Sequence, residues 1–366
     1  MGPSDDSSSA GLPDRIRLVV VFGGVSAEHD VSCVSAREVV SALDPDRYEI
    51  VPVGIRRDGE WVLASDAQLM LGRGAADELP TALSPTGEPI DLLPELHSNR
   101  DGLPTVVFPV LHGPNGEDGT IQGMLELAGV AYVGSGVLGS ALAMDKAAAK
   151  EMLAHRGLPQ ARHRAGAAWD LTGDEAALDD ISADLGFPLF VKPSNMGSSI
   201  GVSKAHDRAE LERAVELALG YDETVVFEEF VAAREIEVGV LGNETPRASV
   251  PGEIIPGAEF YDYEDKYRDG TAKLVIPAAL PAGVADEVAE LALAAYRAVR
   301  AEVLARVDFF YEETGRGLLV NEVNTMPGCT PVSMFPLLWQ ASGLSYRGLL
   351  DEVVRLALAR HARRGR

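Results

Sequence analysis

The sequence lacks the material for several kinds of site. Cys33 and Cys329 are its only cysteines and have no paired spacing, which argues against a disulfide framework or a cysteine zinc site and fits a reducing compartment. No stretch approaches the about 18 uninterrupted apolar residues of a membrane-spanning helix, and residues 1–13 have neither the basic start nor the apolar run of a signal peptide. We therefore expect a flexible tail on a soluble, cytoplasmic protein with no membrane partner.

Basic residues are also scarce. The 366-residue chain is long enough for two or three domains, and its formal net charge is −24 with a pI near 4.6. This charge argues against sequence-independent binding to nucleic acid or to an anionic membrane. A lysine offers a compact ammonium that can meet a phosphate oxygen as a point charge. Among 32 basic residues there are six lysines: Lys146, Lys150, Lys192, Lys204, Lys266 and Lys273.

The N-terminal part of the chain shows the strand-then-helix alternation of a parallel sheet. Apolar runs predict buried strands, and the segments between them predict helices, at 17–22, 31–43, 50–55, 106–110 and 119–128. Residues 14–134 are therefore expected to form one α/β domain. Ligands of such sheets bind at the carboxyl ends of the strands, where the predicted loops carry Glu28 and His112.

A glycine-rich segment at 134–139 matches the G-x-G-x-x-G pattern of dinucleotide-binding proteins. The strand before it is brief, and no acidic residue follows about 20 positions later to hold a ribose. We interpret the segment as a domain boundary with glycine hinges, followed by a helix at 140–155. No G-x-x-x-x-G-K-[ST] phosphate-binding loop occurs in the chain. A Rossmann protein or a nucleotide-binding regulatory module is therefore the weaker interpretation.

A second glycine-rich segment follows a predicted strand at 188–193. Backbone N–H groups of the loop 194–202 can form a concave anion site with Lys192 at its entrance. A plain hairpin turn explains the same loop equally well when the loop is considered alone.

Acidic residues recur in the next two predicted strands. Glu228 and Glu229 lie among the apolar residues of a strand at 224–230, and Glu235 and Glu237 share a face of the following strand. For the second pair, exposed charge at a sheet edge is the simplest interpretation.

Three segments are predicted in the remaining C-terminal region. An aromatic and charged loop at 260–267 is either surface decoration or a lid that closes over a ligand. An alanine-rich amphipathic helix is expected at 284–304, and a last helix with a basic end at 345–363.

Two polar runs near the C-terminus indicate a metal-binding hairpin. Strands at 304–311 and 318–324 are joined by a glycine-bearing turn, and cross-strand pairing then places four polar side chains on one face: Arg306, Asp308, Glu322 and Asn324. Their oxygens are the ligands that Mg²⁺ prefers. An ordinary solvated face is the alternative, but the turn at 326–328 offers backbone N–H groups beside the polar patch.

In this order, the segments resemble the D-alanine:D-alanine ligases of the ATP-grasp family. The most specific segments are 23–28, 112–120, 144–146, 192–201, 261–267 and 321–328. The resemblance implies a fold that is α/β and α+β, a three-domain ATP-grasp architecture with an N-terminal parallel-sheet domain. The implied boundaries are a tail at 1–13, a substrate domain at 14–134, a central domain at 135–227 and a C-terminal domain at 228–366.

The resemblance also implies a reaction. ATP phosphorylates the carboxylate of one D-alanine, and the amine of a second D-alanine attacks the acyl phosphate, which yields D-alanyl-D-alanine for peptidoglycan precursors. The implied ligands are D-alanine, ATP and Mg²⁺, with two metal ions and Mn²⁺ as a substitute, and the implied assembly is a homodimer.

Site residues carry over position by position. The resemblance assigns ATP to Lys146, Lys192, Ser198, Ser199, Glu228, Glu229, Val231, Glu235 and Lys266, and the metal to Asp308, Glu322 and Asn324. It assigns the amino acids to Glu28, His112, Lys266 and Ser333. The catalytic set is Glu28, Ser198, Tyr267, Arg306, Gly328 and Ser333, in which Arg306 and the Gly328 N–H form an oxyanion hole and Glu28, Ser198 and Tyr267 form a triad under the lid.

Some positions depart from the family pattern. Glu229 stands where a lysine can stand, so a side-chain contact to adenine is not expected there, and His29 stands where arginine is common and receives no role. Tyr267 favours a peptide bond over the ester made by relatives that use D-lactate. The alternative function is another ATP-grasp carboxylate-amine ligase, which would share the phosphate and metal residues but not Glu28, Tyr267 and Ser333.

Overall fold

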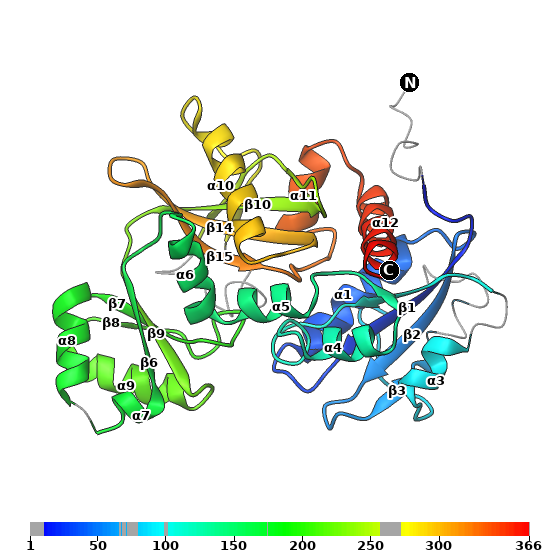
Figure 1. Cartoon of the computed structure of the whole chain (residues 1–366), viewed down its shortest axis with the longest axis horizontal. Helices are drawn as coiled ribbons and strands as arrows, with labels where there is room; N and C mark the ends of the chain where they lie inside the picture. The colour runs from blue at the N-terminus through cyan, green and yellow to red at the C-terminus, as the bar shows by residue number, and fades with distance from the viewer. Residues whose placement is uncertain are drawn as a thin grey trace.

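The computed structural model describes residues 11–65, 67, 71, 80–98, 102–173, 175–256 and 272–365. Its strands form three β-sheets that follow one another along the chain (Figure 1). Within these ranges, no helix combines the length and the apolar character needed to cross a membrane. The segment expected to form a lid, with Lys266 and Tyr267, lies outside the described residues.

The first sheet confirms the predicted parallel arrangement. Its part of the chain contains β1 (Ile16–Gly23), α1 (His29–Ala42), β2 (Tyr48–Ile55), β3 (Trp61–Leu63), α3 (Leu92–His97), β4 (Thr105–Pro109), α4 (Thr120–Leu127) and β5 (Ala131–Tyr132). The strand order is β3-β2-β1-β4-β5, in which only the edge strand β3 of the described strands is antiparallel. All eight residues of β1 are buried, as its continuous apolar run predicts.

Two helices, α5 (Val137–Met144) and α6 (Lys146–His155), stand where the sequence predicted one helix at 140–155. That prediction is wrong at Asp145, whose backbone is extended and ends α5. The Asp145 carboxylate accepts a hydrogen bond from the Ala148 N–H at 2.9 Å and caps α6. The break places Lys146 in the first turn of the new helix.

The second sheet is antiparallel and lies at the lower left of Figure 1. Its elements are β6 (His163–Ala167), α7 (Ala168–Leu171), α8 (Glu175–Leu185), β7 (Leu189–Pro193), β8 (Ser203–Ala205), α9 (Arg208–Leu219) and β9 (Thr224–Glu229), with strand order β6-β9-β7-β8. Leu189 and Val191 of β7 pack in one core with residues of α8 and α9. Because side chains alternate along a strand, Phe190 and Lys192 face the other way.

The third sheet is antiparallel, with order β13-β12-β10-β14-β15 and β11 paired to β10. Its part of the chain contains β10 (Arg234–Gly242), β11 (Arg247–Ala248), β12 (Gly252–Ile255), β13 (Lys273–Val275), α10 (Val284–Ala298), β14 (Val303–Glu312), β15 (Gly317–Asn324), α11 (Met334–Ala341) and α12 (Tyr346–Arg364). The predicted helix at 284–304 is wrong at its end, because β14 begins at Val303. Arg300 has a φ of 56° between the two elements.

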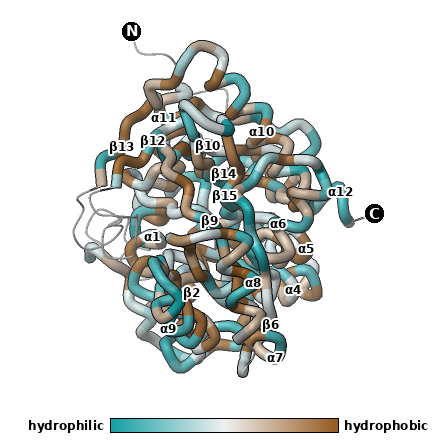
Figure 2. The backbone as a smooth tube through the Cα atoms, turned by 90° about the vertical axis from the view of Figure 1, so that its left-hand side faces the viewer, coloured by the Kyte–Doolittle hydropathy of each residue, from teal (hydrophilic) through white to brown (hydrophobic). Residues whose placement is uncertain are grey.

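The last helix, α12, joins the two ends of the chain. Its residues Leu350 and Val354 share one hydrophobic core with Val106 and Ala131 of the first sheet. Figure 1 shows α12 in red beside the blue strands, and in Figure 2 its exposed C-terminal end is hydrophilic. The first and third sheets are therefore held together by apolar packing, whereas the second sheet has a core of its own.

Candidate functional site

Two adjoining cavities, of about 660 and 450 Å³, lie where the three sheets approach one another. They share part of their lining, including Lys146, Ser198, Arg306 and Glu322. Every predicted site residue that the structure describes lines one of them: Glu28, His112, Lys146, Lys192, Ser198, Ser199, Glu228, Glu229, Val231, Glu235, Arg306, Asp308, Glu322, Asn324, Gly328 and Ser333. Positions separated by up to 305 residues of sequence thus meet in one place.

The hairpin of β14 and β15 forms the floor of the cavities. Arg306 pairs with Asn324 and Asp308 with Glu322, as predicted. A bulge between Asp308 and Phe309 then shifts the register, so the predicted pairing does not continue toward the turn. The bulge increases the local twist beside the polar residues.

Arg306 is held between two carboxylates. Its Nε and Nη2 atoms lie 2.7 Å from the two oxygens of Asp308, and Nε lies 3.0 Å from Glu237 Oε2. Burial opposes the charge of Arg306, but these carboxylates outweigh burial and raise its pKa well above the usual value. Glu237 is 5 % exposed, so the interpretation of this residue as an exposed edge charge is wrong.

The donor set of the hairpin fits a hard divalent cation only with help from a ligand. Within the described part of the chain, no three His, Cys, Asp or Glu side chains form a metal-binding group by themselves. Asp308, Glu322 and Asn324 supply two carboxylates and one carboxamide, and the Asn324 oxygen also accepts a hydrogen bond from Met326 N–H at 2.9 Å. Such a partial oxygen set suits Mg²⁺, which usually keeps waters and takes further oxygens from phosphates.

The glycine and serine loop after β7 is fastened from beneath. Asp145 accepts hydrogen bonds from Ser194 Oγ at 2.6 Å and Asn195 Nδ2 at 3.2 Å, and Lys146 Nζ donates to Met196 O at 2.5 Å. Ser198 has a φ of 50° and Ser199 a φ of 58°. Such left-handed conformations are unfavourable for non-glycine residues by about 1 kcal/mol each. Tertiary contacts therefore hold this loop in a shape that local preference does not.

Behind the loop, Glu228 lies between two lysines. Lys150 Nζ is 2.6 Å from Glu228 Oε1, and Lys192 Nζ is 2.5 Å from Oε2. Burial disfavours the carboxylate, but the two ammonium groups outweigh burial and hold the pKa of Glu228 well below its usual range. Lys150 received no role in the sequence analysis, because lysine scarcity was its only signal.

The N-terminal side of the site carries a buried acidic pair. Ser198 Oγ donates a hydrogen bond to Glu28 Oε1, which joins the central loop to the end of β1. Glu117 accepts from Gly113 N–H at 3.2 Å and lies 3.6 Å from His112 Nδ1. Burial opposes protonation of His112, but the carboxylates of Glu117 and Glu28 outweigh burial and raise its pKa.

A glycine is required beside this pair. Gly113 has a φ of 74°, and a Cβ atom there would lie 2.8 Å from Glu28 Oε2. A side chain would therefore displace the Glu28 carboxylate as well as strain the backbone. On the opposite wall, Ser333 Oγ lies 2.7 Å from Thr330 Oγ1, next to Gly328.

Glu229 points to a different set of partners. Its carboxylate accepts hydrogen bonds from Arg162 N–H at 2.7 Å, Arg162 Nε at 2.8 Å and Arg316 Nη1 at 2.5 Å. Burial raises its pKa, but the Arg162 and Arg316 contacts outweigh burial and lower it. The carboxylate is thus engaged by two arginines, in keeping with the expectation that it makes no side-chain contact to adenine.

Comparisons with known proteins agree across the chain. A family model described as D-ala D-ala ligase N-terminus matches residues 17–135, and one described as D-ala D-ala ligase C-terminus matches residues 152–355. A D-alanine--D-alanine ligase of Bacillus cytotoxicus is 44% identical over 356 residues, covering 95% of this chain and 97% of that protein. One of Bacillus velezensis is 46% identical over 351 residues, covering 93% and 98%.

Solved structures give the same picture. The D-alanine-D-alanine ligase from Coxiella burnetii superposes with a TM-score of 0.78 at 31% identity, covering 96% of this chain and 97% of that one. The VanG D-Ala:D-Ser ligase from Enterococcus faecalis has a TM-score of 0.77 at 34% identity, with coverage of 94% and 99%. The two solved structures thus differ in the second substrate that their titles name.

Proposed function

Because this chain belongs to the D-alanine–D-alanine ligase family, we propose how its own residues carry out that reaction. The protein is an ATP-dependent ligase that joins two D-alanine molecules for cell-wall synthesis. The proposal for its site rests chiefly on one observation. Residues suited to phosphate, to a divalent cation and to an amino acid line two adjoining cavities that share a wall.

The phosphate end of the reaction is assigned to the lysines. Lys146 and Lys192 meet the phosphate oxygens of ATP, and the loop at Ser198 and Ser199 covers them. Adenine and ribose lie toward Val231 and Glu235, where backbone groups rather than the Glu229 carboxylate contact the base. Asp308, Glu322 and Asn324 hold Mg²⁺, with two ions expected, and the bound metal offsets negative charge on the phosphates.

The amino-acid end lies in the larger cavity. Glu28 binds the ammonium group of the first D-alanine, and His112 lies at its carboxylate end. Phosphorylation of that carboxylate gives an acyl phosphate, which the amine of the second D-alanine attacks. Arg306 and the Gly328 N–H stabilise the negative oxygen of the tetrahedral intermediate, and Ser333 binds the carboxylate of the second D-alanine.

Several further assignments belong to the same proposal. Lys266 and Tyr267 act from the lid, with Tyr267 completing a triad with Glu28 and Ser198. The domain boundaries are 14–134, 135–227 and 228–366. The protein acts as a cytoplasmic homodimer.

Phosphate release provides the direct test. Purified protein with MgATP should release phosphate when D-alanine is added and far less when L-alanine or D-lactate replaces it. D-serine, offered together with D-alanine at several pH values, tests the second substrate, because a structurally similar relative is named a D-Ala:D-Ser ligase. Phosphate release that is indifferent to D-alanine would contradict the assignment and favour another ATP-grasp carboxylate-amine ligase.

A further inference from the structure

One buried lysine at the nucleotide cavity has no role in the assignment above. Lys150 lies on α6, one helical turn after Lys146, and its side chain is 3 % exposed. Its Nζ atom approaches Glu228 Oε1 at 2.6 Å, and the Glu228 side chain is 2 % exposed. Among the described residues, neither atom has a hydrogen-bond partner. The ion pair is therefore the contact that compensates the burial of both charges.

Lys150 stands behind the cavity wall rather than in it. Lys146, Lys192 and Glu228 line the smaller cavity, but Lys150 lines neither cavity. Lys192 reaches the other oxygen of Glu228, at 2.5 Å, from the cavity side. Glu228 thus separates a lysine that a ligand can reach from one that it cannot.

This arrangement raises a difficulty for phosphate binding. An ammonium group that meets a phosphate oxygen must weaken its contact with any carboxylate that already holds it. If Glu228 had Lys192 as its sole cationic partner, the departure of Lys192 would leave a buried carboxylate uncompensated, which is strongly unfavourable. A second cation on the far oxygen removes that obstacle.

We propose that Lys150 is a positioning residue that keeps Glu228 compensated from behind, so that Lys192 is free to turn from Glu228 to a phosphate of ATP. The inference rests on the proposed function, because it takes Lys192 as a phosphate ligand. It extends that function by giving the buried pair a part in nucleotide binding. Lys150 itself touches no substrate.

The chemistry of lysine suits both positions. An ammonium group makes single contacts on a flexible stem, so Lys192 can move between two oxygens, whereas an arginine would grip the carboxylate with two parallel bonds. Lys150 is fixed instead by burial. The low pKa of Glu228 is consistent with a carboxylate that stays ionised throughout.

The test is equilibrium binding of MgATP, measured by calorimetry on the full chain without D-alanine. Lys150→Met should weaken ATP binding by about tenfold, because Glu228 then retains Lys192; a tenfold change corresponds to about 1.4 kcal/mol. The KM for D-alanine should stay unchanged. The matched control is Glu151→Met, which removes a charge from the exposed next position of α6 and should leave ATP affinity as it is.

A second variant separates positioning from a merely structural role. In the double variant Lys150→Met with Glu228→Gln, no carboxylate remains to retain Lys192, so most of the lost ATP affinity should return. Replacing both members of a buried pair also spares the fold better than removing one, which covers the case in which Lys150→Met does not fold.

Three outcomes would overturn the inference. Lys150→Met could lower thermal stability with unchanged ATP affinity, which would make the pair purely structural. The double variant could bind ATP as poorly as Lys150→Met or worse. Lys192→Met could bind ATP like the wild type, which would remove the lysine that Lys150 is meant to release. Wild-type protein that fails to bind MgATP at all would instead contradict the proposed function.

Discussion

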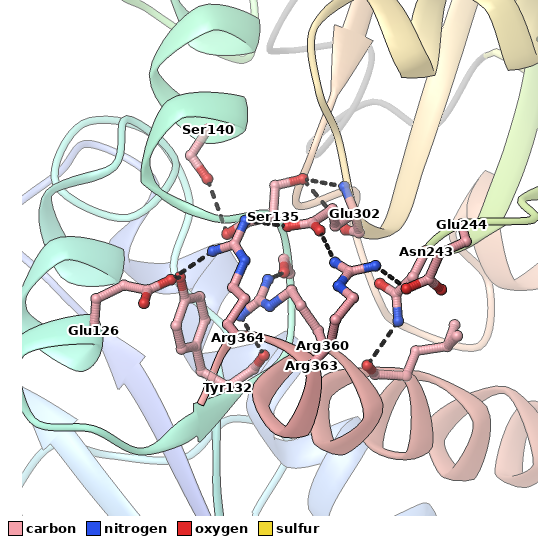
Figure 3. Close-up of polar contacts among 12 residues, drawn as sticks. Glu126, Tyr132, Ser135, Ser140, Asn243, Glu244, Glu302, Arg360, Arg363 and Arg364 are labelled. Atoms are coloured by element: carbon pink, nitrogen blue, oxygen red, sulfur yellow. Dashed lines mark hydrogen bonds and ion pairs between the residues drawn. The ribbon is translucent and has the colours of Figure 1, made fainter. Parts of the chain in front are cut away.

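The lysines of the nucleotide cavity and the arginines at the end of α12 carry the same charge but are held in different ways. Arg360 is 2 % exposed, and its two terminal nitrogens donate to the carbonyl oxygens of Tyr132 and Gly134. Its guanidinium lies 4.0 Å from the centre of the Tyr132 ring. Figure 3 shows this residue with Arg363 and Arg364, which pair with carboxylates around Glu302.

The difference separates a fixed joint from an exchangeable one. The planar fork of Arg360 binds two backbone carbonyls between the first sheet and the glycine segment at 134–139, so this segment is a reinforced connection rather than a loose hinge. Lys146 and Lys192 make single contacts that a phosphate oxygen can replace. In this chain, arginine builds the frame and lysine serves the ligand.

Removing the fork of Arg360 should have the largest effect on folding. Arg360→Met leaves two buried carbonyls without a charged donor, and hydrogen bonds from charged groups contribute about 1.5–3 kcal/mol each. We expect the free energy of unfolding to fall by about 3 kcal/mol or more, measured by urea denaturation, while the KM for ATP of the folded protein stays unchanged.

The control is Arg213→Met, on the exposed surface of α9. Arg213 is 68% exposed, and its nearest carboxylate is 4.0 Å away, so the expected change is below about 0.5 kcal/mol. If Arg360→Met were as mild as Arg213→Met, the contrast between frame and site would fail on the arginine side.

Arg306 is the exception that tests the contrast within the site, since it is an arginine beside the lysines. Arg306→Ala should lower kcat by about 100-fold or more, as removal of an oxyanion donor does, with little change in ATP affinity. Steady-state kinetics and calorimetry measure the two quantities. An equal loss of ATP binding would make Arg306 a phosphate ligand, and an unchanged kcat would leave it as a structural partner of Asp308 and Glu237.

Some of this site follows directly from local sequence patterns. The pairing of Arg306 with Asn324 was predictable because alternation along two strands and a glycine-bearing turn are local signals. The bulge after Asp308 was not, since one extra residue leaves the alternation on each side intact. The end of α10 was equally hidden, because Arg300 takes a positive φ where helices more often place glycine.

Other features depend on contacts between distant segments. The break between α5 and α6 lies in an alanine-rich run that favours helix, and Asp145 is drawn out of it by Ser194 and Asn195 of the later loop. The burial of Glu237 and Lys150 likewise depends on partners from other elements. A sequence pattern gives the residue type at such a position but not the charge that meets it.

Exchanging lysine for arginine in the cavity should have a smaller effect than these deletions. In Lys192→Arg, the guanidinium can bind both oxygens of Glu228 and is released less readily to phosphate. We expect ATP binding to weaken by about tenfold, or about 1.4 kcal/mol, with no loss of thermal stability. Lys273→Arg, at an exposed position of β13, is the control and should bind ATP normally. Normal binding by Lys192→Arg would show that exchangeability does not require lysine.

The smallest effect is expected at the rim of the arginine cluster, which separates buried from exposed arginines. Arg363 pairs with Glu244, but these side chains are 36% and 65% exposed, so solvent screens the pair. Single and double substitutions, Arg363→Gln and Glu244→Gln, form a cycle whose coupling energy should be below about 1 kcal/mol and should shrink as salt is added. Unfolding by urea at low and high ionic strength measures it. A coupling above about 2 kcal/mol, insensitive to salt, would mean that exposed arginines also belong to the frame, and burial would then no longer explain why Arg360 matters most.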